Sequence, residues 1–290
     1  MSETTAPSGQ AESVDTPIIE LQNVEVTFKA RTGSIFKPNH VHAVRGVDMK
    51  IMPGKVLGIV GESGCGKSTT ANVMCGLQVA TKGKVFFMGK DVTKRTAQDR
   101  RHIGSVVSVV FQDPATALNP RMTVQNQLAD PLRVHKVGDE ASREKRVREL
   151  LGLVGLPLSA LNALPGQLSG GQRQRVAIAR ALSLSPKAII ADEPTSALDV
   201  SVRAQILNLL SDLKQELGLA MVFISHDIQT VRYISDRIAV MNAGVVVEEG
   251  DADELLASPK DPYTRKLLGA APSLLHPNLE QFESPSTNEQ

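Results

Sequence analysis

The stretch Gly61–Ser68 reads GESGCGKS and decides the fold. It fits Gly-x-x-x-x-Gly-Lys-[Ser/Thr], the pattern of a phosphate-binding loop, or P-loop. A continuous apolar run, Val56–Val60, precedes it, and a helix predicted to reach Cys75 follows it, with Gly76 as its stop. Glycines let backbone N–H groups curl around phosphate oxygens, and the helix N-terminus adds about half a positive charge. Strand, loop and helix in this order predict a nucleotide site in an α/β fold.

Within this loop, each residue type has a chemical reason to be there. We expect the backbone N–H groups of Gly64–Thr69 to hold phosphate oxygens, Lys67 to reach the outer phosphates, and the Ser68 hydroxyl to bind Mg²⁺. The alternative is a chance glycine turn, which four specified positions would produce in about one such chain per hundred. The nucleotide-binding candidates are Gly61, Glu62, Ser63, Gly64, Cys65, Gly66, Lys67, Ser68 and Thr69.

The composition of the 290 residues excludes several classes of protein. Lysine plus arginine exceed aspartate plus glutamate by 32 − 31 = 1, which argues against a basic protein that wraps nucleic acid and leaves a local basic patch open. The longest apolar stretch, Leu217–Ile224, is eight residues long, whereas a membrane-spanning helix needs about 20. No signal peptide is visible, and two cysteines make neither a disulfide scaffold nor a four-cysteine metal site. We therefore expect a reduced, cytosolic protein.

Two segments before the P-loop predict strands with one wet face. Ile18–Phe28 alternates apolar and polar residues in two phases, and Val47–Ile51 alternates in one. Such alternation is typical of antiparallel sheets. Residues 1–16 and 276–290 are rich in polar residues and are predicted to be flexible tails.

In the second half of the chain, predicted strands again alternate with predicted helices. Val106–Phe111, Ala188–Ala191 and Met221–Ile224 predict buried strands. Between the first two lies a mostly helical stretch, whose clearest helix is Glu140–Val154 because its apolar residues recur at helical spacing. The α/β core therefore carries a helical insertion of roughly 60–70 residues, the size of a small domain.

A second motif, AIIADE at Ala188–Glu193, ends a predicted strand on two carboxylates. Asp192 is expected near the P-loop Mg²⁺, and Glu193 is expected to act as a general base on the attacking water. An acidic strand end without a role is the alternative. The motif is weak alone and strong with a P-loop upstream.

A third motif, LSGGQ at Leu168–Gln172, opens a helix with Ser169 as its N-cap. Val176, Ala179 and Leu182 form the apolar stripe of that helix. Its N-terminus is a second place where free N–H groups can face an anion. The alternative is an ordinary capped helix after a glycine turn.

The three motifs in this order, GESGCGKS, LSGGQRQR and AIIADEPTSALD, resemble the ATP-binding subunit of ABC transporters. The resemblance runs from about Ile18 to Leu275. It implies an α/β P-loop NTPase core with an N-terminal antiparallel β subdomain and an inserted helical subdomain. The implied boundaries are 17–258 for the ATPase domain, about 113–180 for the helical subdomain, and 259–275 for a C-terminal extension.

The resemblance also implies roles for individual residues. In this family two subunits sandwich two ATP molecules head to tail, so the signature of one subunit completes the site of the other. Gln112 matches the glutamine that contacts Mg²⁺ and the attacking water and senses the membrane partner. His226 matches the histidine at the γ-phosphate. The signature residues are Ser169, Gly170, Gly171 and Gln172, and the loop that crosses between subunits is Ser196, Ala197, Leu198 and Asp199.

Two of these residues, and a third candidate, also have interpretations without a role in ATP hydrolysis. Gln112 could be a polar loop residue and His226 a helix N-cap. Phe28 is our candidate for stacking on adenine, which contributes about 1–3 kcal/mol, but it could equally be a core residue at a strand end. The stretch Lys29–Val41 separates Phe28 from the next strand, so the adenine contact could fall elsewhere.

Three further stretches resemble the dipeptide and oligopeptide importer branch: FQDPATALNPRMTV at Phe111–Val124, DPYTRKLLGAAP at Asp261–Pro272, and the insertion Lys29–Val41. They imply two membrane permeases, a sister ATPase or a second copy, and an external solute-binding protein. The solute stays open among peptides, nickel and glutathione. No cysteine follows Cys75, so we expect no iron–sulfur cluster. Gln167 stands where many relatives have Glu.

The sequence therefore predicts an ATP-hydrolysing importer subunit, peripheral to the cytoplasmic face of the cell membrane. A soluble ABC ATPase of DNA repair or translation is disfavoured by the single cassette and the absence of heptads. A non-hydrolysing regulatory member is disfavoured by Lys67, Glu193 and His226. An exporter ATPase is disfavoured by the LNPR and DPYT stretches.

Overall fold

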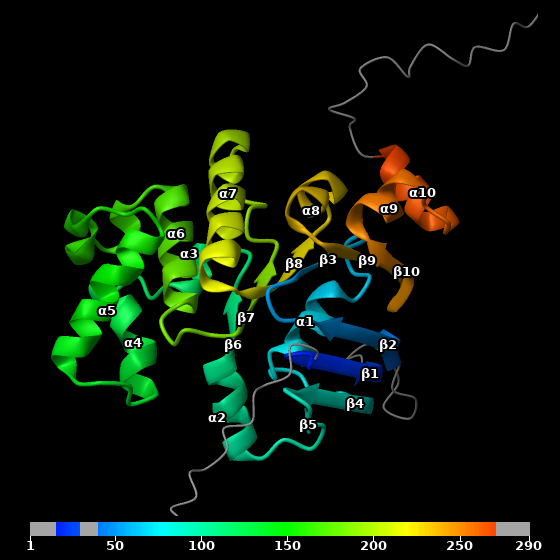
Figure 1. Ribbon diagram of the computed structural model, residues 1–290, viewed down its shortest axis with the longest axis horizontal. Helices are drawn as coiled ribbons and strands as arrows, with labels where there is room; N and C mark the ends of the chain where they lie inside the picture. Colours follow the sequence, from blue (N-terminus) through cyan, green and yellow to red (C-terminus); the bar gives the residue numbers. More distant parts are fainter. Residues whose placement is uncertain (1–15, 30–39, 271–290) are drawn as a thin grey trace, which may run out of the picture.

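The computed structural model describes residues 16–29 and 40–270. The tails predicted at 1–16 and 276–290 and the insertion at 29–41 lie outside these residues except at their edges. Two sheets and a group of helices make up the described chain (Figure 1). None of the helices in these ranges combines the length and apolar character needed to cross a membrane.

The larger sheet has six strands in the order β10-β9-β3-β8-β7-β6. Four of its five strand pairings are parallel, and the pairing of β9 with β10 is antiparallel. The central strands β3 and β8 are buried along their whole length, which confirms the prediction from their continuous apolar runs. The strands are β3 (Val56–Val60), β6 (Val107–Val110), β7 (Ala188–Asp192), β8 (Ala220–Ser225), β9 (Arg237–Asn242) and β10 (Val245–Asp251).

The smaller sheet is antiparallel, in the order β2-β1-β4-β5. Its pairing register shifts between Leu21 and Val24 in β1, and Asn23 there has a φ of 47°. An extra residue of this kind moves the following side chains to the other face, which explains why the apolar alternation of this strand changes phase. The strands are β1 (Ile19–Lys29), β2 (His40–Ile51), β4 (Lys82–Phe87) and β5 (Lys90–Asp91).

The core has two halves, one on each face of the larger sheet. On one face Leu57 and Ile59 of β3 pack with the smaller sheet and with α1 (Lys67–Met74), which contacts β1, β2, β7 and β8. On the other face Val56 and Val60 pack with helices. The helix that begins in the P-loop is therefore held between two sheets, and its N-terminus is fixed at the edge of the larger one.

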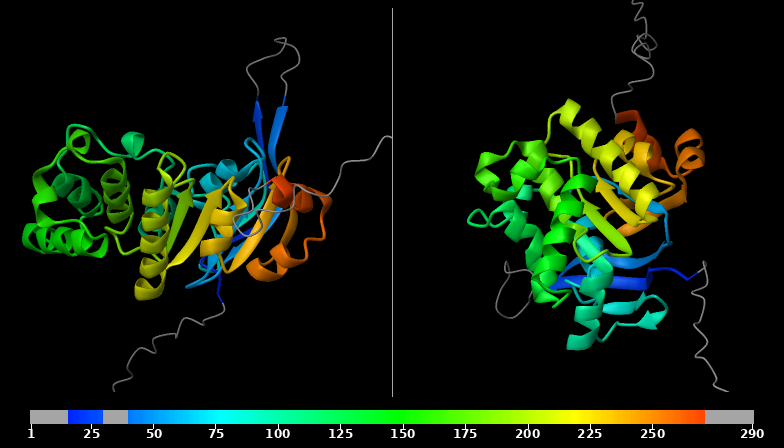
Figure 2. Two further views of the ribbon diagram at one scale, coloured as in Figure 1. Left: turned by 90° about the horizontal axis from the view of Figure 1, so that it is seen from above. Right: turned by 60° about the vertical axis from the view of Figure 1, so that its left-hand side comes forward.

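Four helices form a group to one side of the sheets (Figure 2). They are α3 (Pro114–Ala117), α4 (Val124–Val134), α5 (Glu140–Leu153) and α6 (Gly170–Ala181), with 3-10 turns at Leu158–Asn162 and Pro165–Gln167. The helix predicted at Glu140–Val154 is confirmed, with Asp139 as N-cap and Val154 as C-cap. The predicted fold, an α/β P-loop core with an antiparallel β part and a helical insertion, is confirmed.

Some predicted element ends were wrong. The apolar run that predicted a strand from Val106 spans the end of α2 (Ala97–Val106) and the start of β6, because apolar residues continue across the junction. The second strand begins at His40, well before Val47, because its outer half is largely exposed and shows no alternation. The remaining helices are α7 (Val200–Leu217), α8 (Ile228–Ile234), α9 (Ala252–Ala257) and α10 (Pro262–Ala270).

Candidate nucleotide-binding site

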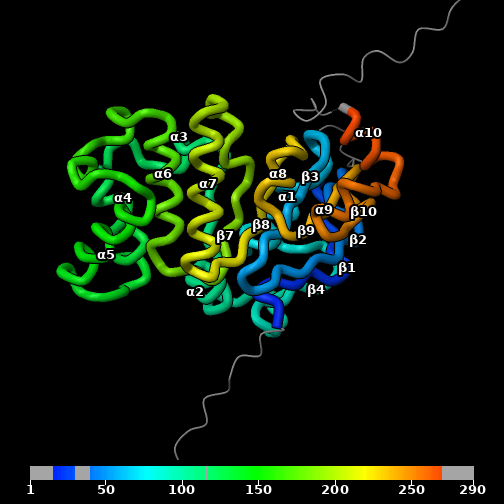
Figure 3. Tube along the Cα trace, turned by 45° about the horizontal axis from the view of Figure 1, so that its top comes forward, coloured from blue at the N-terminus to red at the C-terminus, as the bar shows by residue number. Residues whose placement is uncertain are grey.

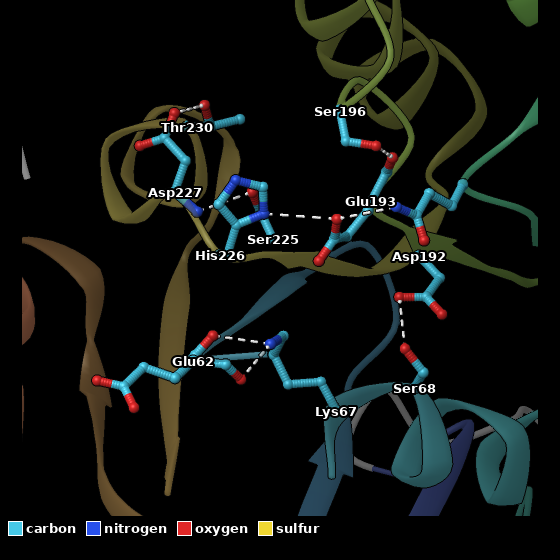
Figure 4. A network of polar contacts seen from close by, with 12 residues as sticks. Glu62, Lys67, Ser68, Asp192, Glu193, Ser196, Ser225, His226, Asp227 and Thr230 are labelled. Carbon is cyan, nitrogen blue, oxygen red and sulfur yellow. Dashed lines mark hydrogen bonds and ion pairs between the residues drawn. The ribbon is translucent and has the colours of Figure 1, made fainter. Parts of the chain in front are cut away.

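Four neighbouring parallel strands end at one edge of the larger sheet, and each delivers predicted site residues there. The P-loop follows β3, His226 follows β8, Asp192 and Glu193 end β7, and Gln112 follows β6 closely. Figure 4 shows Lys67, Ser68, Asp192, Glu193 and His226 converging from these segments. The pocket they surround is lined by Ala43, Ser63, Gly64, Gly66, Lys67, Ser68, Thr69, Gln112, Glu193 and His226. Ligands bind at this edge in open α/β sheets.

Lys67 is only 5% exposed, and its ammonium lies across the P-loop. Its Nζ donates to the backbone oxygens of Gly61 at 2.7 Å and Glu62 at 2.9 Å. A buried cation needs such partners to offset the loss of its hydration. The positive charge is therefore held inside the loop, beside the backbone N–H groups at the start of α1.

Gly66, the N-cap of α1, has a φ of 108° and sits against the backbone of β2. A Cβ atom built there would lie 2.4 Å from the carbonyl oxygen of Ala43. We predict that Gly66→Ala lowers the free energy of unfolding by about 2–4 kcal/mol, because it adds backbone strain and a backbone clash. Urea unfolding of the purified chain measures this loss.

Gly64→Ala is the matched control for that variant. Gly64 also has a positive φ, 79°, but a Cβ there would meet no atom within 4 Å. It should cost only the strain, about 1–2 kcal/mol. Equal losses in the two variants would contradict the close approach of Ala43.

The side-chain oxygens of Asp192 and Ser68 lie next to each other, as the predicted Mg²⁺ site requires. Ser68 Oγ donates to Asp192 Oδ1 at 3.2 Å. Burial raises the pKa of Asp192 above its usual range, and the Glu193 charge adds to the rise, while the Ser68 hydrogen bond and the Lys67 charge act against it. A divalent cation would favour the ionised carboxylate. Hydroxyl and carboxylate oxygens are donors that Mg²⁺ prefers, so these residues fit the ion.

Glu193 is the centre of the polar contacts in the pocket. Its Oε2 lies 3.3 Å from Gln112 Nε2, which donates to it, and 3.4 Å from His226 Nδ1. The backbone of Glu193 has a φ of 47°, and its carbonyl oxygen accepts hydrogen bonds from the Ser196 hydroxyl and backbone N–H. A strained, multiply anchored carboxylate inside a pocket is typical of a functional position.

His226 is not the cap of the helix that follows it. Asp227 takes that place in α8, because its Oδ1 accepts a hydrogen bond from the Gln229 backbone N–H. The alternative interpretation of His226 as a helix cap was therefore wrong. Its imidazole is 61% exposed and lines the pocket.

The signature stretch has the predicted local structure. Ser169 is the N-cap of α6, and Ser169 and Gln172 exchange hydrogen bonds between side chain and backbone in a capping box. A Cβ at Gly171 would lie 2.7 Å from a methyl group of Val202 in α7. Asp199, in the predicted crossing loop, is the N-cap of α7. Figures 1 and 3 show α6 beyond α7 from α1, and no signature residue is among those that line the pocket.

The predicted adenine contact, Phe28, does not lie on the wall of the pocket. Phe28 is 40% exposed at the end of β1 and is not among the residues that line the pocket. Ala43 of β2 lines it instead, and no sequence signal pointed to that residue. Phe28 therefore stays a prediction without support from the pocket geometry.

A family model described as "ABC transporter" matches residues 44–196, more than half of the chain. This range holds the P-loop, the signature and the two carboxylates at the end of β7. The chain belongs to the ABC transporter family. It is therefore an ABC ATPase.

Proteins of known name are similar in sequence to most of the length of this ABC ATPase. It is 45% identical over 269 residues to the oligopeptide transport ATP-binding protein OppF of Salmonella typhimurium, covering 91% of this chain and 80% of OppF. It is 44% identical to the probable D,D-dipeptide transport ATP-binding protein DdpF of Escherichia coli, covering 91% and 82%. Among solved structures, the dimeric ATP-binding cassette MJ0796 bound to ADP and Pi matches with a TM-score of 0.71 at 34% identity, covering 81% and 98%.

Proposed function

We propose that this ABC ATPase hydrolyses ATP to power an importer of dipeptides, oligopeptides or a related solute. The observation that carries the proposal is the 45% identity to the OppF of Salmonella typhimurium over 91% of the chain. DdpF, at 44% identity, supports a peptide-like solute. The pocket supports the hydrolytic step, because it brings a P-loop lysine and a candidate base to one cavity.

In this proposal the P-loop binds the phosphates of ATP. The backbone N–H groups of Gly64–Thr69 face the phosphate oxygens, and the Lys67 ammonium neutralises their charge. Ser68, Gln112 and Asp192 would hold Mg²⁺, which would supply charge stabilisation to the phosphates. Phosphoryl transfer needs such positioning and electrostatic support more than covalent help from the protein.

Glu193 then takes a proton from the attacking water. Its contact with Gln112 Nε2 at 3.3 Å holds the carboxylate in the pocket. His226, within 3.4 Å of the same carboxylate, orients the water and the γ-phosphate. Gln112, His226 and Glu193 are the catalytic residues of the proposal.

We infer that two ATPase subunits form the complete site. Ser169, Gly170, Gly171 and Gln172 begin α6, and the N-terminus of that helix would face the ATP of the partner. The loop Ser196–Asp199 would cross to the partner, next to Glu193. The place of α6 beyond α7 from α1 supports this arrangement (Figure 3), as does the dimeric form of the MJ0796 cassette. We favour a sister ATPase over a second copy, from the insertion at Lys29–Val41.

A groove between the helical group and the sheet suits the membrane partners. It is lined by Leu77, Phe111, Val134, His135 and Arg180, among others. Leu77, Phe111 and Val134 are exposed apolar side chains, which are typical of protein interaction sites. We propose that a short cytoplasmic helix of one permease docks there, beside Gln112, and that the second permease docks on the other ATPase subunit. The ATPase then lies at the cytoplasmic face of the cell membrane, and a solute-binding protein acts outside.

The domain boundaries belong to the same proposal. We assign 17–258 to the ATPase domain, about 113–180 to its helical subdomain and 259–275 to an importer-type C-terminal extension. Helices α3, α4, α5 and α6 span Pro114–Ala181, which supports the second boundary pair.

Gentle purification of the tagged chain from solubilised membranes, followed by mass spectrometry, tests this function. We expect two multi-span permeases and a second ATPase to co-purify. Leu77→Asp in the groove should lose the permeases, whereas Leu158→Asp, also exposed but outside the groove, should keep them. Recovery from the soluble fraction without membrane partners would instead indicate a soluble ABC ATPase, and partners of an efflux system would indicate an exporter.

A further inference from the structure

The motif DPYT, which the ATP site does not use, begins the last described helix. Its Asp261 caps the start of α10 by accepting a hydrogen bond from the Tyr263 backbone N–H at 2.8 Å. The Glu248 carboxylate of β10 accepts the backbone N–H groups of Lys260 at 2.8 Å and Asp261 at 3.1 Å. The start of α10 is therefore tied to β10, and Figures 1 and 3 show it beside β10 and α9.

From this position α10 contacts the P-loop directly. The hydroxyl oxygen of Tyr263 accepts a hydrogen bond from the Glu62 backbone N–H at 3.0 Å, across 201 residues of sequence. The ring of Tyr263 packs against the hydrophobic core. Burial raises the pKa of the Tyr263 phenol above its usual value, so the hydroxyl stays neutral near pH 7.

Glu62 is consequently held on three sides. Its N–H donates to Tyr263, its carbonyl oxygen accepts from Lys67 Nζ at 2.9 Å, and its carboxylate lies 3.7 Å from Lys266 Nζ on α10. The Lys266 pair is exposed at both ends, so it contributes little and is screened by salt. The Tyr263 contact is the stronger link between α10 and the loop.

We propose that Tyr263 is a positioning residue for the nucleotide, because it holds the first turn of the P-loop in the shape that places Lys67. This inference rests on the proposed function of the loop as an ATP site. The loop has three glycines in eight residues, and glycine loses the most conformational freedom on ordering. The Tyr263 hydrogen bond to Glu62 orders the loop before the phosphate binds, so less conformational entropy is lost on binding. The affinity for the nucleotide therefore rises, although Tyr263 does not contact the nucleotide.

The test compares Tyr263→Phe with Tyr233→Phe in the full chain. Tyr233 is a matched control because its hydroxyl donates to Asn208 Oδ1 at 2.6 Å, so both variants lose one hydroxyl and one hydrogen bond. Amide hydrogen exchange reports on the Glu62 N–H itself. Calorimetry with ADP, which the enzyme does not turn over, reports on phosphate binding.

We expect faster exchange at Glu62 and about two- to tenfold weaker ADP binding in Tyr263→Phe only, the range of one hydrogen bond. In ATPase assays the KM for ATP should rise by a similar factor while kcat stays within about twofold, since the hydroxyl touches no reacting atom. Glu248→Gln, which loosens the start of α10, should shift exchange in the same direction and add little to Tyr263→Phe.

Two results would overturn the proposal. One is unchanged exchange at Glu62 in Tyr263→Phe, and the other is an ADP affinity no weaker than that of Tyr233→Phe. Failure of the ATP site itself would look different, because the unmodified chain would then bind neither ADP nor ATP.

Discussion

Glu193→Gln is expected to bind ATP normally and to lose turnover by about 10²–10⁴-fold, the contribution of a positioned general base. The amide keeps the shape of the side chain but takes up no proton from water. Its neighbours, Gln112 Nε2 at 3.3 Å and His226 Nδ1 at 3.4 Å, stay in reach. Phosphate release from the purified complex measures kcat, and calorimetry in the same variant measures ATP affinity.

Glu144→Gln is the control, because it makes the same chemical change on the exposed surface of α5, where Glu144 pairs with Arg148 at 2.8 Å. It should leave kcat unchanged. Full turnover in Glu193→Gln would remove Glu193 from the role of base. The candidate would then be His226, which is the titratable side chain that lines the pocket apart from Glu193 and Lys67.

Lys67→Ala is expected to weaken ATP binding by about ten- to hundredfold. Charge-assisted hydrogen bonds contribute about 1.5–3 kcal/mol, and Lys67 brings the buried ammonium of the P-loop. The variant also leaves the backbone oxygens of Gly61 and Glu62 without their donor, so thermal unfolding should be measured together with the ATP affinity.

Lys145→Ala on the exposed face of α5 is the matched control, since it also removes one lysine charge from the chain. Its ATP affinity should equal that of the unmodified chain. An unchanged affinity in a folded Lys67→Ala variant would refute the assignment of the P-loop as the phosphate site.

Local patterns in the sequence were enough to predict much of the fold and of the candidate site. The helix at Glu140–Leu153 follows from apolar spacing within a few turns. The strands β3 and β8 follow from short apolar runs, and the Ser169 cap follows from one residue type before a helix. Each depends on interactions between residues close in sequence, so the sequence alone contains the information.

One hairpin of the larger sheet was missed. The hairpin of β9 and β10 turns through Ala243 and Gly244, with φ values of 46° and 88°. Hairpin turns of this kind usually carry Asn-Gly or Asp-Gly, so an Ala-Gly pair gave no clear signal. The strand β10 is intermediate in burial along most of its length, which leaves neither an alternating nor a continuous apolar pattern.

By itself the sequence determined the phosphate-binding loop, the two carboxylates after a buried strand and the capped signature helix, because each is a contiguous motif with a local physical cause. Only the tertiary structure decided which of them meet. The strand order β3-β8-β7-β6 brings Lys67, His226 and Glu193 to one edge. Helix packing puts α6 beyond α7 from α1, and the attachment of α10 to β10 sets Tyr263 against Glu62. These placements result from packing between segments distant in sequence, and no local pattern encodes them.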